Sequence, residues 1–132
     1  KSLPYKKIWV NPNVDAGSRT IVKAIRRLNN IKFMKNLSPE KYAELIKNSI
    51  CLIGNTSSGI KEGAFLGVRY VCIGKRQQDR EHSNNVVFTE NTTESIVTAF
   101  EKAMKLDPKP SYMFGDGTAG EKITEVLSTC IY

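Results

Sequence analysis

Short apolar runs alternate along the chain with stretches whose apolar residues lie three or four positions apart. The runs at residues 8–10, 31–34, 50–53, 68–73 and 86–88 predict β-strands. Helical spacing predicts helices over residues 18–28, from 39 to 46, after residue 59 through Leu66, and at 96–104 and 123–131. Strands that alternate with helices indicate an α/β fold, in which helices cover both faces of a parallel sheet.

Cap and turn residues predict where several of these elements begin and end. Ser18 is predicted to cap the first helix, and Ser38-Pro39 to open the second, with serine as the cap and proline in the first helical position. The run at 50–53 contains no polar residue, which predicts a strand covered on both faces. The run at 68–73 is likewise predicted to be buried, and Gly74 closes it. The buried face of the second helix is predicted to be Tyr42, Leu45 and Ile46.

Size and composition are those of an ordinary soluble globular protein. The chain has 132 residues, 40% of them hydrophobic and 25% charged, and is expected to form a single domain over 1–132. It has neither an apolar run of roughly 18–20 residues nor a secretory signal, so we expect a cytoplasmic protein without a membrane partner. Cys51, Cys72 and Cys130 lie in apolar stretches, and they are expected to be reduced core thiols rather than metal ligands.

The net charge of +7 comes from the first half of the chain. Residues 1–66 hold twelve Lys and Arg against four Asp and Glu, whereas residues 67–132 hold eight against nine. Such a field attracts phosphates, including those of nucleic acid. Solvated helix faces are the simpler interpretation for most of these residues, and no aromatic-plus-basic strand pattern of an RNA-recognition module accompanies them. Nine of the twelve lie within residues 1–35: Lys1, Lys6, Lys7, Arg19, Lys23, Arg26, Arg27, Lys32 and Lys35.

The most informative local feature is GNTSSGIKEG at residues 54–63. An apolar strand enters a turn rich in Gly, Ser and Thr, and a helix follows. Glycines let the backbone approach a ligand, and a helix N-terminus offers unpaired N–H groups to phosphate. Hydroxyls of Thr56, Ser57 and Ser58 can add donors. Spacing alone leaves phosphate binding and an ordinary capped helix equally open, since neither the Walker sequence nor GxGxxG is present.

Charged residues near this turn suggest further roles. Glu62 would repel phosphate, so its carboxylate is better placed to accept hydrogen bonds from two ribose hydroxyls. Alternatively, it is simply an acidic residue that the positive end of the helix dipole favours in the first turn. Arg76 follows the next strand and can fork onto diphosphate oxygens. Lys75 and Arg80 are expected to be surface groups, and His82, the only histidine, is expected to face solvent.

Asn13 and Asp15 end the first strand in NPNVDAGS, at the same predicted sheet edge. Asn13 can read a base or a phosphate, whereas Asp15 is better suited to capping the next helix. No close pair of acids and no Cys-His pattern is apparent. The residues therefore predict a binding surface without a catalytic centre.

Four motifs in order, NPNVDAGS, GNTSSGIKEGAFLGV, IGKRQQDRE and YMFGDGTAGEKI, closely resemble the C-terminal half of hydrolysing UDP-N-acetylglucosamine 2-epimerases. The resemblance runs from about Ile8 to Leu127. It implies a Rossmann-like domain of a two-domain, GT-B-like enzyme. It also implies anti elimination of UDP from UDP-N-acetylglucosamine, followed by addition of water to give N-acetylmannosamine, a sialic-acid precursor. The family's acid/base groups lie mainly in its N-terminal half, so we expect no catalytic residue in this chain and no turnover by it alone.

The resemblance also assigns residues. It implies that UDP is bound by Asn13, Thr56, Ser57, Ser58, Gly59, Glu62 and Arg76. It implies neither a cofactor nor a metal, and it implies a homo-oligomeric full-length protein. Thr56 stands where serine is commoner, Arg69 where proline is frequent, and Asp79 where glycine is frequent. Gly115-Asp116-Gly117 matches the family's GDG and is expected to be a turn into the last helix.

Three other interpretations stay open. In animal bifunctional members the helix matching residues 18–28 belongs to a feedback site for CMP-sialic acid, and Lys23 and Arg26 keep positive charge there. The chain can also be the donor-nucleotide domain of a GT-B glycosyltransferase, although the RQQ and GDG motifs speak against it. A basic nucleic-acid-binding module is the third alternative.

Overall fold

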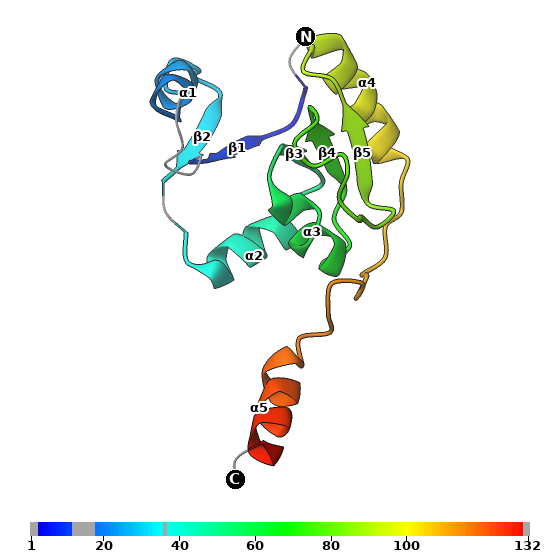
Figure 1. Ribbon diagram of the computed structural model, residues 1–132. Helices are drawn as coiled ribbons and strands as arrows, with labels where there is room; N and C mark the ends of the chain where they lie inside the picture. The colour runs from blue at the N-terminus through cyan, green and yellow to red at the C-terminus, as the bar shows by residue number, and fades with distance from the viewer. Residues whose placement is uncertain (1–2, 12–17, 36, 131–132) are drawn as a thin grey trace. The chain divides into compact units, whose positions relative to one another are not determined.

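A computed structural model describes residues 3–11, 18–35 and 37–130 of the chain. The described chain divides into two compact units, Lys1–Tyr42 and Ala43–Tyr132. Each unit contains its own parallel sheet with helices (Figure 1). The predicted α/β class with parallel strands is therefore confirmed, whereas a single domain over the whole chain stays a prediction.

The first unit is a strand–helix–strand arrangement. β1 (Lys7–Val10) pairs in parallel with β2 (Ile31–Met34), and α1 (Ser18–Ile25) lies between them in sequence. The helix ends earlier than its apolar spacing predicts, because a tight turn in which the Leu28 amide donates to Ile25 O (2.9 Å) follows it. Leu28 is consequently outside the helix and 50% exposed. The guanidinium of Arg26 lies 5.8 Å from the centre of the Phe33 ring, which places one basic side chain of this unit against an aromatic face.

α2 (Pro39–Lys47) crosses the boundary between the units in sequence. It begins as predicted: the Lys41 amide donates to Ser38 Oγ (3.4 Å), and Pro39 occupies the first helical position. Ile46 is 1% exposed, and Tyr42 and Leu45 are half-buried. The predicted buried face of this helix is therefore confirmed.

The second unit holds three parallel strands in the order β3-β4-β5 (Figure 1, green). They are β3 (Leu52–Gly54), β4 (Tyr70–Ile73) and β5 (Val86–Thr89). β4 is central and buried on both faces: Tyr70 and Cys72 pack with Ile60 on one side, and Val71 points to the other because successive strand residues alternate. The prediction that this strand is buried is confirmed.

One strand departs from its prediction. The run at 50–53 predicts a strand covered on both faces, but β3 has only three residues and starts at Leu52. Ile50 and Ile53 are 45% and 43% exposed. The physical reason is position in the sheet: β3 is an edge strand of the three-stranded sheet, where an apolar run need not be enclosed.

Helices complete the second unit. A 3-10 turn η1 (Ser57–Gly59) precedes the short α3 (Glu62–Phe65), which covers only part of the helix predicted after residue 59 through Leu66. α4 (Thr93–Met104) packs against β4 and β5 and buries Ala99, Phe100 and Ala103. α5 (Ala119–Thr129) is the last helix, and it buries no residue. Within the described residues, no helix combines the length and apolar character needed to cross a membrane.

The cysteines are free thiols in three different settings. Cys72 is buried, Cys51 is half-buried, and Cys130 is exposed, so the prediction of a core thiol is wrong for Cys130. Burial raises the pKa of Cys51 to about 11 and also raises the pKa of Cys72. Both therefore stay protonated near neutral pH, which makes them poor nucleophiles.

Candidate functional site

The hydroxyl loop, residues 54–59, leaves the carboxyl end of β3 and enters α3. Thr56 precedes η1, and its Oγ1 accepts from the Ser58 amide (3.2 Å). The Thr56 side chain thus serves as the helix cap, and the Ser58 N–H is not available to a ligand. Ser57 and Ser58 are half-buried, and Thr56 is exposed. The loop presents hydroxyls at the sheet edge, as the sequence predicts.

Tyr70 supports this loop from the neighbouring strand. Its ring is fully buried, and its hydroxyl shares one hydrogen between Gly54 O (3.1 Å) and Thr56 O (2.9 Å). A Cβ on Gly59 would lie 2.5 Å from three atoms of the Tyr70 ring. Gly59 is therefore required for the close approach of the loop to Tyr70, which is a structural reason independent of any ligand.

Two buried amide side chains hold the same loop. Gln77, 2% exposed, donates from Nε2 to Asn55 O (3.1 Å). Asn85, 1% exposed, donates from Nδ2 to Gly59 O (3.0 Å) and to Val68 O (2.9 Å). Sequence reasoning missed both, because Asn and Gln are mostly exposed and no pattern in their own segments indicates burial.

These contacts have one electrostatic consequence. Donors elsewhere in the protein occupy the loop's backbone carbonyls at residues 54, 55, 56 and 59, and the Ser57 carbonyl accepts from the amides of Ile60 and Lys61 at 3.0 Å each. Carbonyl oxygens carry partial negative charge and repel anions. With these oxygens engaged inside the protein, the loop repels an anionic ligand less, and the hydroxyls of Thr56, Ser57 and Ser58 can donate to it.

Arg76 lies on the adjacent loop. β3 and β4 run in parallel with Gly54 opposite Cys72, so the hydroxyl loop and the segment after Gly74 leave the same edge of the sheet. Gly74 has φ 74°, a left-handed conformation that glycine adopts without strain. Arg76 itself is exposed, and the next residue, Gln77, bonds to the hydroxyl loop. The two predicted phosphate-binding segments are thereby tied to each other.

The remaining predicted residues have separate outcomes. Glu62 is the first residue of α3 and is exposed, which agrees with either predicted role. Asn13 and Asp15 lie outside the described residues, so their roles stay predictions. His82 is exposed as predicted, and its ring meets Phe88 edge-on with centroids 5.0 Å apart. No group of three or more His, Cys, Asp or Glu side chains that could hold a metal occurs in the described ranges.

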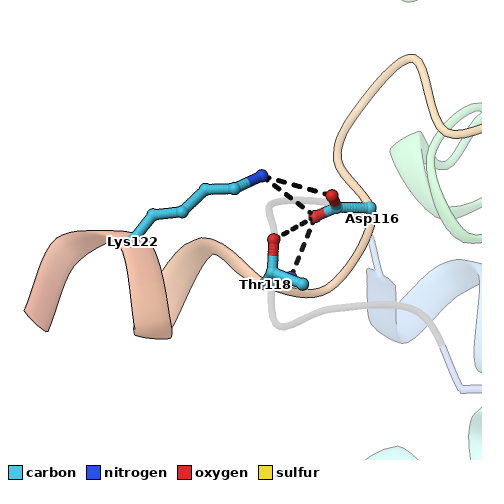
Figure 2. A network of polar contacts seen from close by, with 3 residues as sticks. All are labelled: Asp116, Thr118 and Lys122. Atoms are coloured by element: carbon cyan, nitrogen blue, oxygen red, sulfur yellow. Dashed lines mark hydrogen bonds and ion pairs between the residues drawn. The ribbon is translucent and has the colours of Figure 1, made fainter. Parts of the chain in front are cut away.

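The GDG loop, residues 115–117, precedes α5 and is held by contacts among Asp116, Thr118 and Lys122 (Figure 2). Asp116 Oδ1 accepts from the Thr118 hydroxyl (2.5 Å) and amide (3.0 Å), and Oδ2 lies 3.2 Å from Lys122 Nζ. The bonds from Thr118, followed by that from Lys122, lower the pKa of Asp116 to about 2. Gly115 and Gly117 have φ 121° and 91°. The predicted turn into the last helix is confirmed.

Comparison with known proteins identifies the family. The model of the UDP-N-acetylglucosamine 2-epimerase family matches residues 2–128. A UDP-N,N'-diacetylbacillosamine 2-epimerase (hydrolyzing) from Legionella pneumophila is 32% identical over 92% of this chain and 33% of its own length. A UDP-N-acetylglucosamine 2-epimerase from Neisseria meningitidis is 28% identical over 92% of this chain and 34% of its own length. A GDP/UDP-N,N'-diacetylbacillosamine 2-epimerase (hydrolyzing) from Campylobacter jejuni is 38% identical over 54% of this chain and 18% of its own length.

The fold defines a broad class, that of α/β proteins with parallel strands, in which ligands usually bind beyond the carboxyl ends of the strands. More specifically, this chain belongs to the UDP-N-acetylglucosamine 2-epimerase family. The predicted resemblance is confirmed at that level. The chain spans about a third of the length of the Legionella and Neisseria relatives.

Proposed function

We propose that this chain forms the uridine-diphosphate-binding part of a hydrolysing UDP-sugar 2-epimerase. The observation that carries the proposal is the hydroxyl loop, whose carbonyls at residues 54, 55, 56, 57 and 59 are engaged within the protein. Family membership supplies the class of ligand. The names of the relatives share a UDP-sugar but differ in the sugar, so the UDP moiety is the part we assign to this chain.

In this proposal the diphosphate lies between the hydroxyl loop and Arg76. Ser57 and Ser58 donate from their hydroxyls, Gly59 allows the close approach, and Arg76 neutralises charge with a forked hydrogen bond. Thr56 holds the loop as its cap and can still donate its own hydroxyl hydrogen. Glu62 accepts from the two ribose hydroxyls, and Asn13 reads the base or a phosphate.

The reaction then assigns a specific task to this site. A base outside the described residues removes the C2 proton of UDP-N-acetylglucosamine, the C1–O bond breaks, and UDP leaves with the electron pair as a 2-acetamidoglucal forms. Water then adds across the double bond to give N-acetylmannosamine. Negative charge develops on the departing diphosphate, so donors aimed at it stabilise the transition state. The chain by itself is expected to bind UDP weakly and to turn over nothing.

Binding measurements test the assignment. In calorimetry with UDP, we expect Arg76→Ala to weaken binding about tenfold or more, because it removes a charge-assisted hydrogen bond. Ser57→Ala should weaken it about fivefold, through loss of one neutral hydrogen bond. Arg80→Ala is the matched control, since Arg80 is an exposed arginine in the same loop. Wild-type affinity in both site variants would overturn the assignment.

The same measurement distinguishes UDP binding from the alternative of a nucleic-acid-binding module. If the chain is a nucleic-acid-binding module, arbitrary duplex DNA should bind with a steep dependence on salt while UDP gives no heat. UDP binding that DNA does not displace supports the epimerase assignment. A homo-oligomeric full-length protein and a cytoplasmic location stay predictions.

A further inference from the structure

Gln77 is a buried polar side chain, and no contact in the described part of the fold offsets the stability lost by burying its carbonyl oxygen. Its Nε2 donates to Asn55 O at 3.1 Å, and since a carbonyl can only accept, this contact fixes which end of the amide faces the loop. The other end, Oε1, is buried without a hydrogen-bond partner among the described residues. A buried acceptor without a donor destabilises a fold. An apolar side chain of similar shape would therefore suit stability better.

The position of Gln77 suggests what it does instead. Its backbone belongs to the loop after β4, directly after Arg76, and its side chain reaches the loop after β3. The contact joins residues 22 positions apart across the carboxyl ends of two adjacent parallel strands. It is thus a cross-link between the two segments that present hydroxyls and a guanidinium at this edge of the sheet.

We propose that Gln77 is a positioning residue that holds the hydroxyl loop in one conformation relative to the loop carrying Arg76. Its use in nucleotide binding rests on the proposed function, whereas its effect on the loop does not. A site whose donors are fixed before the ligand arrives loses less conformational entropy on binding. If the link is removed, only a fraction of molecules has both segments in place, and the apparent affinity falls by that fraction.

Gln77→Met tests the proposal because Met is close to Gln in shape but donates no hydrogen bond. Hydrogen exchange of the Ser58, Ile60 and Lys61 amides, which donate to Thr56 Oγ1 and Ser57 O, should lose protection about three- to tenfold in the ligand-free chain, the equivalent of one net hydrogen bond. The dissociation constant for UDP should rise by a similar factor, while the unfolding midpoint is unchanged or higher. Gln78→Met is the matched control, since Gln78 is the exposed neighbour.

A second variant tests whether the Gln77 side chain positions the loop through its hydrogen bond or only fills space. Gln77→Glu keeps the length of the side chain, and its carboxyl group can donate to Asn55 O only when protonated. Burial at this position raises the pKa of such a carboxyl above its usual range. In the ligand-free chain, protection of the same amides relative to wild type should therefore be low at pH 7.5 and recover at pH 5. A side chain that merely fills space would show no such recovery.

The outcomes are distinct. Unchanged loop protection in Gln77→Met overturns the proposal, as does a lowered unfolding midpoint with protection lost throughout the second unit, since that marks a general structural role. If wild-type protein does not bind UDP, the proposed function fails. The exchange data still decide in that case whether Gln77 fixes the loop.

Discussion

The hydroxyl loop and the GDG loop look alike in sequence, yet they keep their shapes by different means. Both are glycine-containing polar turns that lead into a helix. The hydroxyl loop is held by buried side chains distant in sequence, Tyr70, Gln77 and Asn85. The GDG loop is held by the half-buried Thr118 and the exposed Lys122, two and six positions from Asp116.

The difference lies in which residues determine the conformation of each loop. Distant, buried contacts make the hydroxyl loop part of the core, so a change in the core alters the loop and a change in the loop affects the core. Local contacts make the GDG loop a self-contained turn before α5, whose loss affects little beyond that helix. Three substitutions test this distinction between the two loops.

The largest effect is expected from Gly59→Ala. The added methyl group would overlap the Tyr70 ring at 2.5 Å, and both sites are buried. We expect a loss of about 3 kcal/mol in the free energy of unfolding, the upper range for overpacking. Gly54→Ala is the control, since its Cβ meets nothing within 4 Å. Similar denaturation midpoints for the two variants would show that Tyr70 does not fix the loop.

Asn85→Ala should have an intermediate effect. It removes the donor to Gly59 O and Val68 O, and water entering the space would replace part of the lost bonding. We expect a loss of about 2 kcal/mol, measured by urea unfolding. The exposed neighbour Asn84, changed to Ala, should lose nothing measurable. Equal losses in the two variants would contradict a specific role for the buried amide.

The smallest effect is expected from Asp116→Ala. Thr118 amide exchange should accelerate while the unfolding midpoint stays unchanged, with Asp107→Ala as an exposed, ion-paired control. The pKa of Asp116 is lowered from 3.8 to about 2, so the bonds of its carboxylate to Thr118 and Lys122 are present above pH 3.8 and are lost as the pH falls toward 2. The Thr118 amide resonance should titrate with a midpoint near 2. A midpoint near 3.8 would contradict the network in Figure 2.

Local signals in the sequence predict much of this fold and less of its site. The strands at 31–34 and 86–88 and the cap at Ser38 follow from apolar runs and helix-start chemistry, and these signals lie within a few residues. The exposure of Ile53 depends on which strand lies at the sheet edge, and no local pattern records that.

The site shows the same limit. The hydroxyls of Thr56, Ser57 and Ser58 are visible in the sequence because they lie in one glycine-flanked turn. The burial of Gln77 and Asn85 is not, because their hydrogen-bond partners on the loop lie 22 and 26 positions away. A polar side chain in a loop is ordinarily solvated, and only tertiary contacts reverse that expectation.

The engaged carbonyls of the hydroxyl loop also bear on how such a protein can diversify. The backbone of the loop takes its shape from Tyr70 and from the two buried amides, while its surface side chains, Thr56 among them, contribute little to that shape beyond one cap. Mutation can therefore exchange the outward-facing groups one at a time and sample new ligands without refolding the loop. The supporting residues, in contrast, must change together or not at all.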